Sequence, residues 1–186
     1  MALYAEGDGA AFRRLFELMA PRIRAFFLRS FADAAVADDL TQATFLKLHS
    51  ARVSYRADRP LKPWVFTIAA GVRCDELRRR YRLPRHVGEA DLESVEATLV
   101  SDASTTEDHS EDHSNDAARA EAVRDAIKRL PESQRVVVHL HRYEELTFEQ
   151  IAEVLGTTPG AVRVRASRAY ERLREDLRPY ITRGGG

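Results

Sequence analysis

The sequence predicts an all-α fold made of two small helical domains that are joined by a flexible acidic linker. Three observations support this prediction. Apolar residues recur at helical spacing in residues 1–84 and 119–182, and no segment shows a convincing strand pattern. Residues 85–118 lose the helical periodicity and become acidic and rich in serine. The ranges 1–84, 85–118 and 119–182 are therefore expected to be a domain, a linker and a second domain.

Composition limits the class of protein. The chain has 186 residues, of which 44% are hydrophobic and 31% charged, and this suits one ordinary domain or two small ones. No apolar run approaches the roughly 20 residues that span a bilayer, and the N-terminus lacks a secretory pattern. Cys74 is the single cysteine, so no internal disulfide is possible. We expect a cytoplasmic protein of bacterial type without membrane insertion.

The net charge of zero conceals a strong segregation of charge along the chain. Residues 1–83 carry 15 Lys or Arg against 9 Asp or Glu, and residues 119–186 carry 13 against 10. Residues 84–118 carry 1 against 10. Two basic blocks are thus separated by an acidic spacer, so the blocks rather than the overall charge are informative about nucleic-acid binding.

The N-terminal block contains several helical patterns. In AAFRRLFELMAPRIRAFFLRSF, Pro21 either occupies the first turn of a second helix or kinks a longer one. DDLTQATFLKLH is the next helix, and SARVSYRADRPLKP is a loop that holds two prolines. The stretch WVFTIAAGVRCDELRRR then predicts one helix, from Trp64 to Arg80, that is apolar in its first half and cationic at its end.

The two halves of the Trp64–Arg80 helix suggest different roles. The apolar half is expected to be buried among the preceding helices and to hold the basic end rigidly, so that Arg73 and Arg78–Arg80 can grip a phosphate backbone. The alternative is an ordinary surface helix end, where arginines complement the helix dipole. The residues alone do not separate these two interpretations.

The linker contains SDASTTEDHSEDHSND, which cannot bury enough apolar surface to offset the entropy of ordering it. His109 and His113 lie in it beside carboxylates and are candidate metal ligands. Without a thiolate or a rigid scaffold nearby, a metal site is the less favoured interpretation, and no cofactor is expected.

The C-terminal block predicts a helix-turn-helix after the helices AARAEAVRDAIKRL and ESQRVVVHLHRYEE. Thr147 is placed to cap a short helix, with Gln150 in capping-box position. Gly156 follows where helices commonly end in a left-handed residue. Thr158 caps the next helix, and Pro159 occupies its first turn.

The second helix of this motif has a distinct outer face. At about 100° per residue, Val162, Ala166, Ala169 and Leu173 form an inner stripe, and Val164 points away from it. An outward valine between arginines suits the DNA major groove, where it meets thymine methyls while arginines reach guanines or phosphates. A solvated basic helix in an ordinary bundle is the alternative. Arg163 and Ser167 flank the inner stripe on one side, and Arg165 and Arg168 flank it on the other.

Two blocks together resemble a known family. DDLTQATFLKLH followed by WVFTIAAGVRCDELRRR resembles region two of bacterial sigma factors of the extracytoplasmic-function group, and RLPESQRVVVHLHRYEELTFEQIAEVLGTTPGAVRVRASRAYERLR resembles their region four. The resemblance covers most of the chain outside the linker. It implies that region two docks on the clamp coiled coil of core RNA polymerase and reads and opens the minus-ten promoter element. It implies that region four reads the minus-thirty-five element.

The resemblance also assigns residues by position. It implies that Asp39, Gln42 and Leu46 meet the polymerase clamp. It implies that the loop around Tyr55 and Arg56 receives a base flipped from the non-template strand, which Tyr55 could stack on. Arg73, Arg78 and Arg79 would hold the adjacent DNA backbone. The residues that would face the minus-thirty-five major groove are Thr158, Arg163, Val164, Arg165, Ser167 and Arg168.

The chain departs from the family pattern at two positions. Ala43 stands where an acidic residue is usual, so one polar contact to polymerase is expected to be absent. Gly71 stands where asparagine is common, so base reading by a side chain is not expected there.

Two other function classes would account for parts of the sequence. A stand-alone helix-turn-helix regulator would act without polymerase, but it would have no reason to carry the N-terminal block. A hydrolase or metal enzyme has little support, because the histidines are scattered and no nucleophile or phosphate-binding motif is present. The chain is therefore expected not to be an enzyme. The resemblance further implies an anti-sigma partner, while promoter sequence and inducing signal are not readable from the residues.

Overall fold

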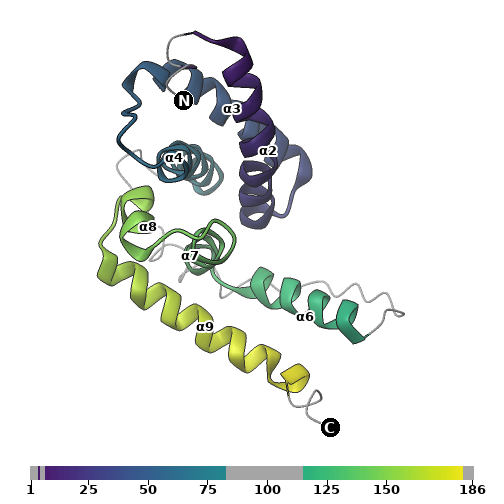
Figure 1. Cartoon of the computed structure of the whole chain (residues 1–186). Coiled ribbons are helices and arrows are strands. Elements are labelled where there is room, and N and C mark those ends of the chain that lie inside the picture. The colour runs from purple at the N-terminus through teal and green to yellow at the C-terminus, as the bar shows by residue number, and fades with distance from the viewer. Residues whose placement is uncertain (1–3, 5–6, 83–114, 182–186) are drawn as a thin grey trace.

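The computed structural model describes residues 4, 7–82 and 115–181, and in these ranges its regular structure is entirely helical. The predicted all-α fold is confirmed. Two groups of helices are visible in Figure 1, and we call α2–α4 the N-terminal domain and α6–α9 the C-terminal domain. The elements are α2 (Gly9–Phe31), α3 (Ala34–Ala51), the 3-10 turn η1 (Arg52–Ser54), α4 (Leu61–Tyr81), α6 (Asn115–Arg129), α7 (Glu132–Arg142), α8 (Phe148–Leu155) and α9 (Pro159–Ile181).

The first long helix settles the two alternatives for Pro21. Helix α2 runs through Pro21 as one element of 23 residues, so a longer helix forms and not two short ones. The Asp8 side chain caps its start by accepting from the N–H groups of Ala10 and Ala11. The helix ends at Ala32, which adopts the left-handed conformation and donates its N–H to the carbonyl of Leu28. The apolar side of α2 is buried at Leu15, Met19, Ile23, Phe26 and Phe27.

Helix α3 begins at Ala34, earlier than the segment DDLTQATFLKLH suggests. The reason is a local cap, since the Asp33 side chain accepts from the N–H of Val36. Two threonines lie on the buried side of α3 and satisfy their hydroxyls within the helix. Thr41 donates to the carbonyl of Ala37 and Thr44 to that of Leu40. A polar side chain at these positions is therefore compatible with burial.

Helix α4 lies at the centre of the molecule. It packs on α3 and α2 on one side and on α8 of the C-terminal domain on the other (Figure 1). Its apolar first half is buried at Val65, Phe66, Ala69 and Ala70, as the sequence predicts. Helix α7 contacts α2, so a second pair of helices joins the two domains. Residues 83–114, which connect α4 to α6, lie outside the described part of the chain.

The two domains share one apolar core. A single cluster of buried residues includes Phe26 and Phe66 of the N-terminal domain together with Val137 and Ile151 of the C-terminal domain. The sequence suggests a separate core for each domain, and the continuous cluster is the main feature that the sequence does not indicate. Within the described ranges, no helix combines the length and the apolar character that crossing a bilayer requires.

Candidate nucleic-acid interface

The helix-turn-helix forms with the local contacts that its sequence predicts. Thr147 accepts from the N–H of Gln150 at 3.2 Å, and the Gln150 side chain accepts from the N–H of Thr147 at 3.0 Å, which completes the capping box. Gly156 ends α8 with φ of 61°, in the left-handed region. Thr158 then accepts from the N–H of Ala161 at 3.2 Å and starts α9. These contacts set where α8 begins and ends and where α9 begins.

The outer face of α9 is open to solvent. Val162, Ala166 and Ala169 are buried, as predicted for the inner stripe. Val164 points outward and is 49% exposed. Thr158, Arg163, Ser167 and Arg168 are also exposed and lie along the same helix. This face presents an apolar side chain between polar and cationic ones.

Arg165 does not belong to this face. It was expected to face DNA with its neighbours, but its side chain is only 2% exposed and ranks among the largest fully buried side chains. The angle estimate placed Arg165 on the flank of the inner stripe, and the long side chain turns into the protein. Arg165 is therefore a buried structural residue in this arrangement.

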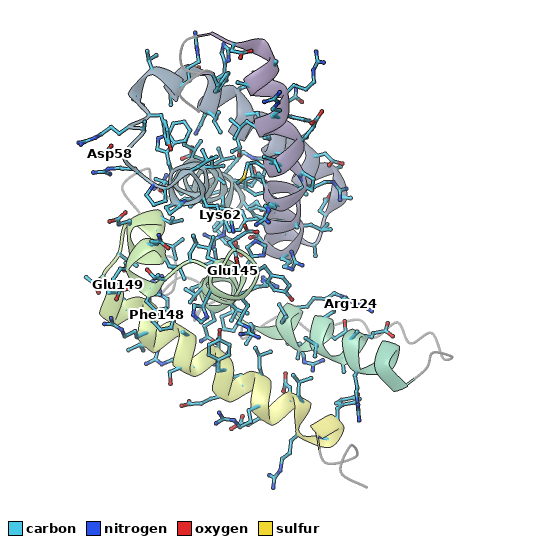
Figure 2. All side chains as sticks on the ribbon, viewed as in Figure 1. Asp58, Lys62, Arg124, Glu145, Phe148 and Glu149 are labelled. Carbon is cyan, nitrogen blue, oxygen red and sulfur yellow. The ribbon has the colours of Figure 1, made fainter. Side chains whose placement is uncertain are left out.

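Arg163 is held by the other helix of the motif. Its Nη2 lies 2.7 Å from Oε1 of Glu149. Glu149 lies on the first turn of α8, where Figure 2 labels it. The pKa of Glu149 is lowered by its own backbone N–H, with further contributions from Thr147 and Arg163. Sequence reasoning missed Glu149 as a site residue. Its position as an acidic residue in the first turn was visible, but the pairing with Arg163 depends on how α8 and α9 cross.

Each arginine at the basic end of α4 pairs with a carboxylate one turn earlier on the same helix. Arg78 pairs with Asp75 at 3.0 Å, and Glu76 receives both Arg79 at 2.7 Å and Arg80 at 2.8 Å. The hydrogen bond from Arg79 is the main cause that holds the pKa of Glu76 below its ordinary value. Asp75 also receives Lys47 of α3 at 2.8 Å. The end of α4 therefore carries a network of ion pairs.

Arg73 lies elsewhere on α4. It was expected to hold DNA backbone beside Arg78 and Arg79, but it is 0% exposed and its Nε lies 2.8 Å from Oε1 of Glu132 on α7. Before Arg78, the exposed positions of the helix are Thr67, Gly71 and Asp75, which are four residues apart and therefore share another side. Arg73 cannot reach DNA while the domains are packed as in this structure.

The loop before α4 places Tyr55 against Trp64. Their ring centroids are 4.9 Å apart with planes at 64°, and the Tyr55 hydroxyl donates to the carbonyl of Arg59. Arg56 is exposed and pairs with Asp58 at 2.9 Å. Tyr55 is half-buried, so one part of its ring is supported while another part meets solvent. A tyrosine ring that is held by a neighbouring ring and partly exposed can stack on a planar group.

A groove lies between α2 and α3, with a volume of about 840 Å³. Its floor is apolar and includes Phe12, Phe16 and Phe45, and the pair formed by Arg24 and Asp38 lies on its rim at 2.6 Å. Gln42 and Leu46, which the sequence resemblance assigns to polymerase, line this groove, and Leu46 is 65% exposed. Asp39 is exposed and precedes Gln42 by almost one turn. The aromatic floor was not identified from the sequence.

The remaining candidate residues have different outcomes. His109 and His113, the candidate metal ligands, lie outside the described residues. Among the residues that the structure describes, no group of three His, Cys, Asp or Glu side chains is placed to hold a metal ion. Gly71 is exposed on α4, and Ala43 is half-buried on α3.

Comparisons with known proteins agree with this arrangement. Residues 15–83 match the family model of sigma-70 region 2, and residues 120–173 match that of sigma-70 region 4. The chain is 36% identical over 177 residues to the RNA polymerase sigma factor CarQ of Myxococcus xanthus, covering 95% of each chain. It is 26% identical to the ECF RNA polymerase sigma factor SigW of Bacillus subtilis, covering 93% of this chain and 92% of that one.

A solved structure is also similar. The sigma factor RpoE of Bartonella quintana, in complex with the anti-sigma factor NepR, matches with a TM-score of 0.66 and 26% identity. The match covers 90% of this chain and 97% of that one. CnrH, in complex with the cytosolic domain of CnrY, matches with a TM-score of 0.63 and 25% identity, covering 96% and 94%.

Proposed function

The chain belongs to the sigma-70 family of RNA polymerase sigma factors, and from this premise we propose that it is a promoter-specificity subunit of the extracytoplasmic-function group. It binds core RNA polymerase and directs it to specific promoters. The N-terminal domain reads and opens the minus-ten element, and the C-terminal domain reads the minus-thirty-five element. As a transcription initiation factor it supplies specificity, while the polymerase carries out the chemistry.

One observation carries this proposal. The chain presents an exposed apolar groove in the N-terminal domain and, separately, an exposed major-groove face on α9. A regulator that only bound DNA would use the second surface and would gain nothing from the first. A groove of this volume with an aromatic floor suits an amphipathic helix of a large partner.

The groove is the proposed docking site for the polymerase clamp. Leu46 supplies an exposed apolar anchor at the groove, Gln42 lines it, and Asp39 supplies a charge close by. Ala43 is half-buried between them, so the acidic residue usual in the family would have met a partly apolar environment here. The contact to polymerase therefore relies on apolar area more than on charge.

The DNA contacts are proposed on two surfaces. At the minus-ten element, Tyr55 stacks on a displaced base, and Arg56, Arg78 and Arg79 contact phosphates. The half-exposed Tyr55 ring and the high exposure of Arg56 and Arg79 support these roles. At the minus-thirty-five element, the contacts come from Thr158, Arg163, Val164, Ser167 and Arg168. Arg73 and Arg165 are left out because both are buried.

The partners follow from the same family. Core polymerase and promoter DNA are the obligatory partners, and the solved complex of RpoE with NepR supports an anti-sigma partner for this chain as well. The site of action is the cytoplasm, where polymerase and chromosome are found. No cofactor is needed for these roles.

The test compares two exposed leucines. Leu46 is 65% exposed at the groove and Leu18 is 68% exposed on α2 outside the groove lining, so Leu18→Asp is a matched control for Leu46→Asp. We expect wild type and Leu18→Asp to co-elute with core polymerase and to start transcription at a cognate promoter. Leu46→Asp should lose co-elution, because an aspartate at the groove removes an apolar anchor and adds a charge that must be desolvated.

Other outcomes would decide against the proposal. Sequence-specific DNA binding that is indifferent to polymerase, with equal behaviour of all three proteins, would favour the stand-alone regulator. Equal loss of co-elution in Leu18→Asp and Leu46→Asp would place the polymerase contact outside the groove. Transcript sequencing with the reconstituted enzyme would then identify the promoters that the wild-type subunit selects.

A further inference from the structure

Glu149 is an acidic side chain beside the face of α9 that the proposed function turns towards DNA. It lies on the first turn of α8, where Figure 2 labels it, and its side chain is 61% exposed. Its carboxylate lies 2.7 Å from Nη2 of Arg163, whose side chain is 56% exposed. Both members of the pair are open to solvent, so DNA that covers Arg163 would also come close to Glu149.

The fold of the helix-turn-helix does not depend on this pair. An exposed ion pair contributes little to stability, because water solvates both groups in the unfolded chain and fixing two long side chains costs entropy. Helix α8 is held at its start by the capping box of Thr147 and Gln150 and at its end by Gly156. Helix α9 has its own cap at Thr158. The charge of Glu149 can therefore be removed while the motif stays folded.

An arginine on a helix in the major groove has two classes of partner. It can contact a phosphate, which carries no sequence information, or the O6 and N7 atoms of guanine, which identify the base. Phosphates are anions, so a cation without a neighbouring carboxylate is attracted to them. A phosphate that approached Arg163 would also approach the carboxylate of Glu149, and the two anions would repel each other. A guanine edge carries no net charge and does not meet this repulsion.

The contact also leaves Arg163 able to bond to a base. A guanidinium group has five N–H donors in a planar fork, and Glu149 contacts it through Nη2. The other N–H groups can supply two parallel hydrogen bonds to guanine. The Glu149 carboxylate is itself held by its own backbone N–H and by the Thr147 side chain. A side chain that is restrained before binding loses less conformational entropy when it meets the base.

We propose that Glu149 is a positioning residue that sets the specificity of Arg163, because it directs the guanidinium to a guanine edge and opposes its contact with phosphates. The inference rests on the proposed function, since it requires α9 to lie in the major groove. Glu149 acts through Arg163 and needs no contact of its own with DNA. Removing the charge of Glu149 should therefore give DNA binding that is tighter and less selective.

The experiment uses core polymerase reconstituted with each variant. Its affinity is measured for promoters changed at single positions of the upstream element, at several salt concentrations. Wild type should prefer guanine at one position by about tenfold or more. Glu149→Gln keeps the size of the side chain and removes its charge, and it should reduce this preference to about two- to threefold. Affinity for all promoters should rise, and the salt dependence should become steeper by about 0.9, because Arg163 then contacts a phosphate.

Two further variants separate Glu149 from other causes. Glu153→Gln removes an equal charge from an exposed position four residues later on α8, and it should keep the wild-type preference for guanine. In an Arg163→Ala background, the additional change Glu149→Gln should leave the remaining base preferences unchanged. Circular dichroism of each variant verifies that its helices are retained.

Several results would overturn the inference. An equal preference for guanine in wild type and Glu149→Gln would show that Glu149 does not direct Arg163. A weaker affinity of Glu149→Gln for all promoters would show that its charge does not oppose phosphate contact. A loss of preference that Glu149→Gln also causes in the Arg163→Ala background would assign the effect to Glu149 itself. These three results leave the proposed function intact, whereas a wild-type complex that selects no base upstream would overturn both.

Discussion

The basic end of α4 and the basic face of α9 have similar compositions but hold their arginines in different ways. On α4, Arg78, Arg79 and Arg80 pair with Asp75 and Glu76 one turn earlier on the same helix. On α9, Arg163 pairs with a carboxylate from another helix, Glu149, and stands beside the outward Val164. The pairs on α4 stabilise the end of that helix. The pair on α9 holds the Arg163 side chain in a defined position against α8. A basic helix in a sequence therefore does not by itself identify a DNA-reading surface.

The largest effect expected from this comparison concerns Arg163. Arg163→Ala should relax the choice of base at one position of the upstream element, with a loss of about 1–3 kcal/mol of discrimination. The measurement is the affinity of the reconstituted polymerase for a set of promoters changed at single positions. Arg174→Ala, an exposed change farther along α9, is the control. If Arg163→Ala instead lowered the affinity for all promoters equally, Arg163 would contact a phosphate and not a base.

The boundary between the two regions gives the next effect, which depends on pH. Burial, reinforced by the charge of Arg29, lowers the pKa of His139 from 6.5 to about 3. Arg29 and Glu144 face the ring, and Arg22 pairs with that Glu144. Because the folded pKa is lowered, the contribution of neutral His139 is complete above pH 6.5. It is lost progressively as the pH falls from 6.5 towards 3.

This sign predicts a specific difference between two proteins. Between pH 7.5 and 5.5, the wild type should lose about 1.4 kcal/mol more free energy of unfolding than His139→Leu. Urea unfolding at both pH values measures it, and subtracting the result for the variant cancels the contributions of the other titrating groups, which both proteins share. Equal pH dependence in the two proteins would mean that His139 is not held neutral at the boundary.

Alanine substitutions at two glycines, one in each region, are expected to change stability in opposite directions. Gly156 ends α8 with φ of +61°, so Gly156→Ala should cost about 1–2 kcal/mol of stability and disturb the angle of the helix-turn-helix. At Gly71 of α4 an added Cβ meets no atom within 4 Å, so Gly71→Ala should stabilise by about 0.5–1 kcal/mol. Thermal unfolding of both variants measures the change in stability. A change in the same direction for Gly156→Ala and Gly71→Ala would contradict the prediction.

The smallest effect is expected for Arg79. Because Arg80 still pairs with Glu76, Arg79→Ala should change the free energy of unfolding by no more than about 0.5 kcal/mol. Binding to DNA should weaken to a similar degree for all promoter sequences, and the salt dependence should become shallower by about 0.9. Titrations of the reconstituted polymerase at several salt concentrations measure this. A change in sequence preference would give Arg79 a reading role.

The parts of the molecule that could be predicted from the sequence are those with local causes. Thr147, Gln150, Gly156 and Thr158 lie within one turn of the groups they bond, so residue spacing alone predicts their contacts. The inner stripe of α9 follows from helical periodicity in the same way. These positions could be identified before any tertiary contact was known.

The parts that could not be predicted depend on residues that are distant in the chain. The burial of Arg73 requires Glu132, which belongs to another domain. The pairing of Arg163 with Glu149 requires the crossing angle of two helices, and the aromatic floor of the groove requires α2 to lie along α3. A side chain such as that of Arg165, which is long enough to turn inward from the flank of a helix, is also misplaced by an angle estimate.

The shared apolar core has a practical consequence for dissecting this protein. Producing the two halves as separate fragments would divide this core, which includes Phe26 and Phe66 on one fragment and Val137 and Ile151 on the other. Each fragment would then expose apolar surface to water and would tend to self-associate or to bind detergents and chaperones. Fragments made separately would consequently understate the competence of the intact polypeptide, whereas co-producing them in one cell would let each half cover the other.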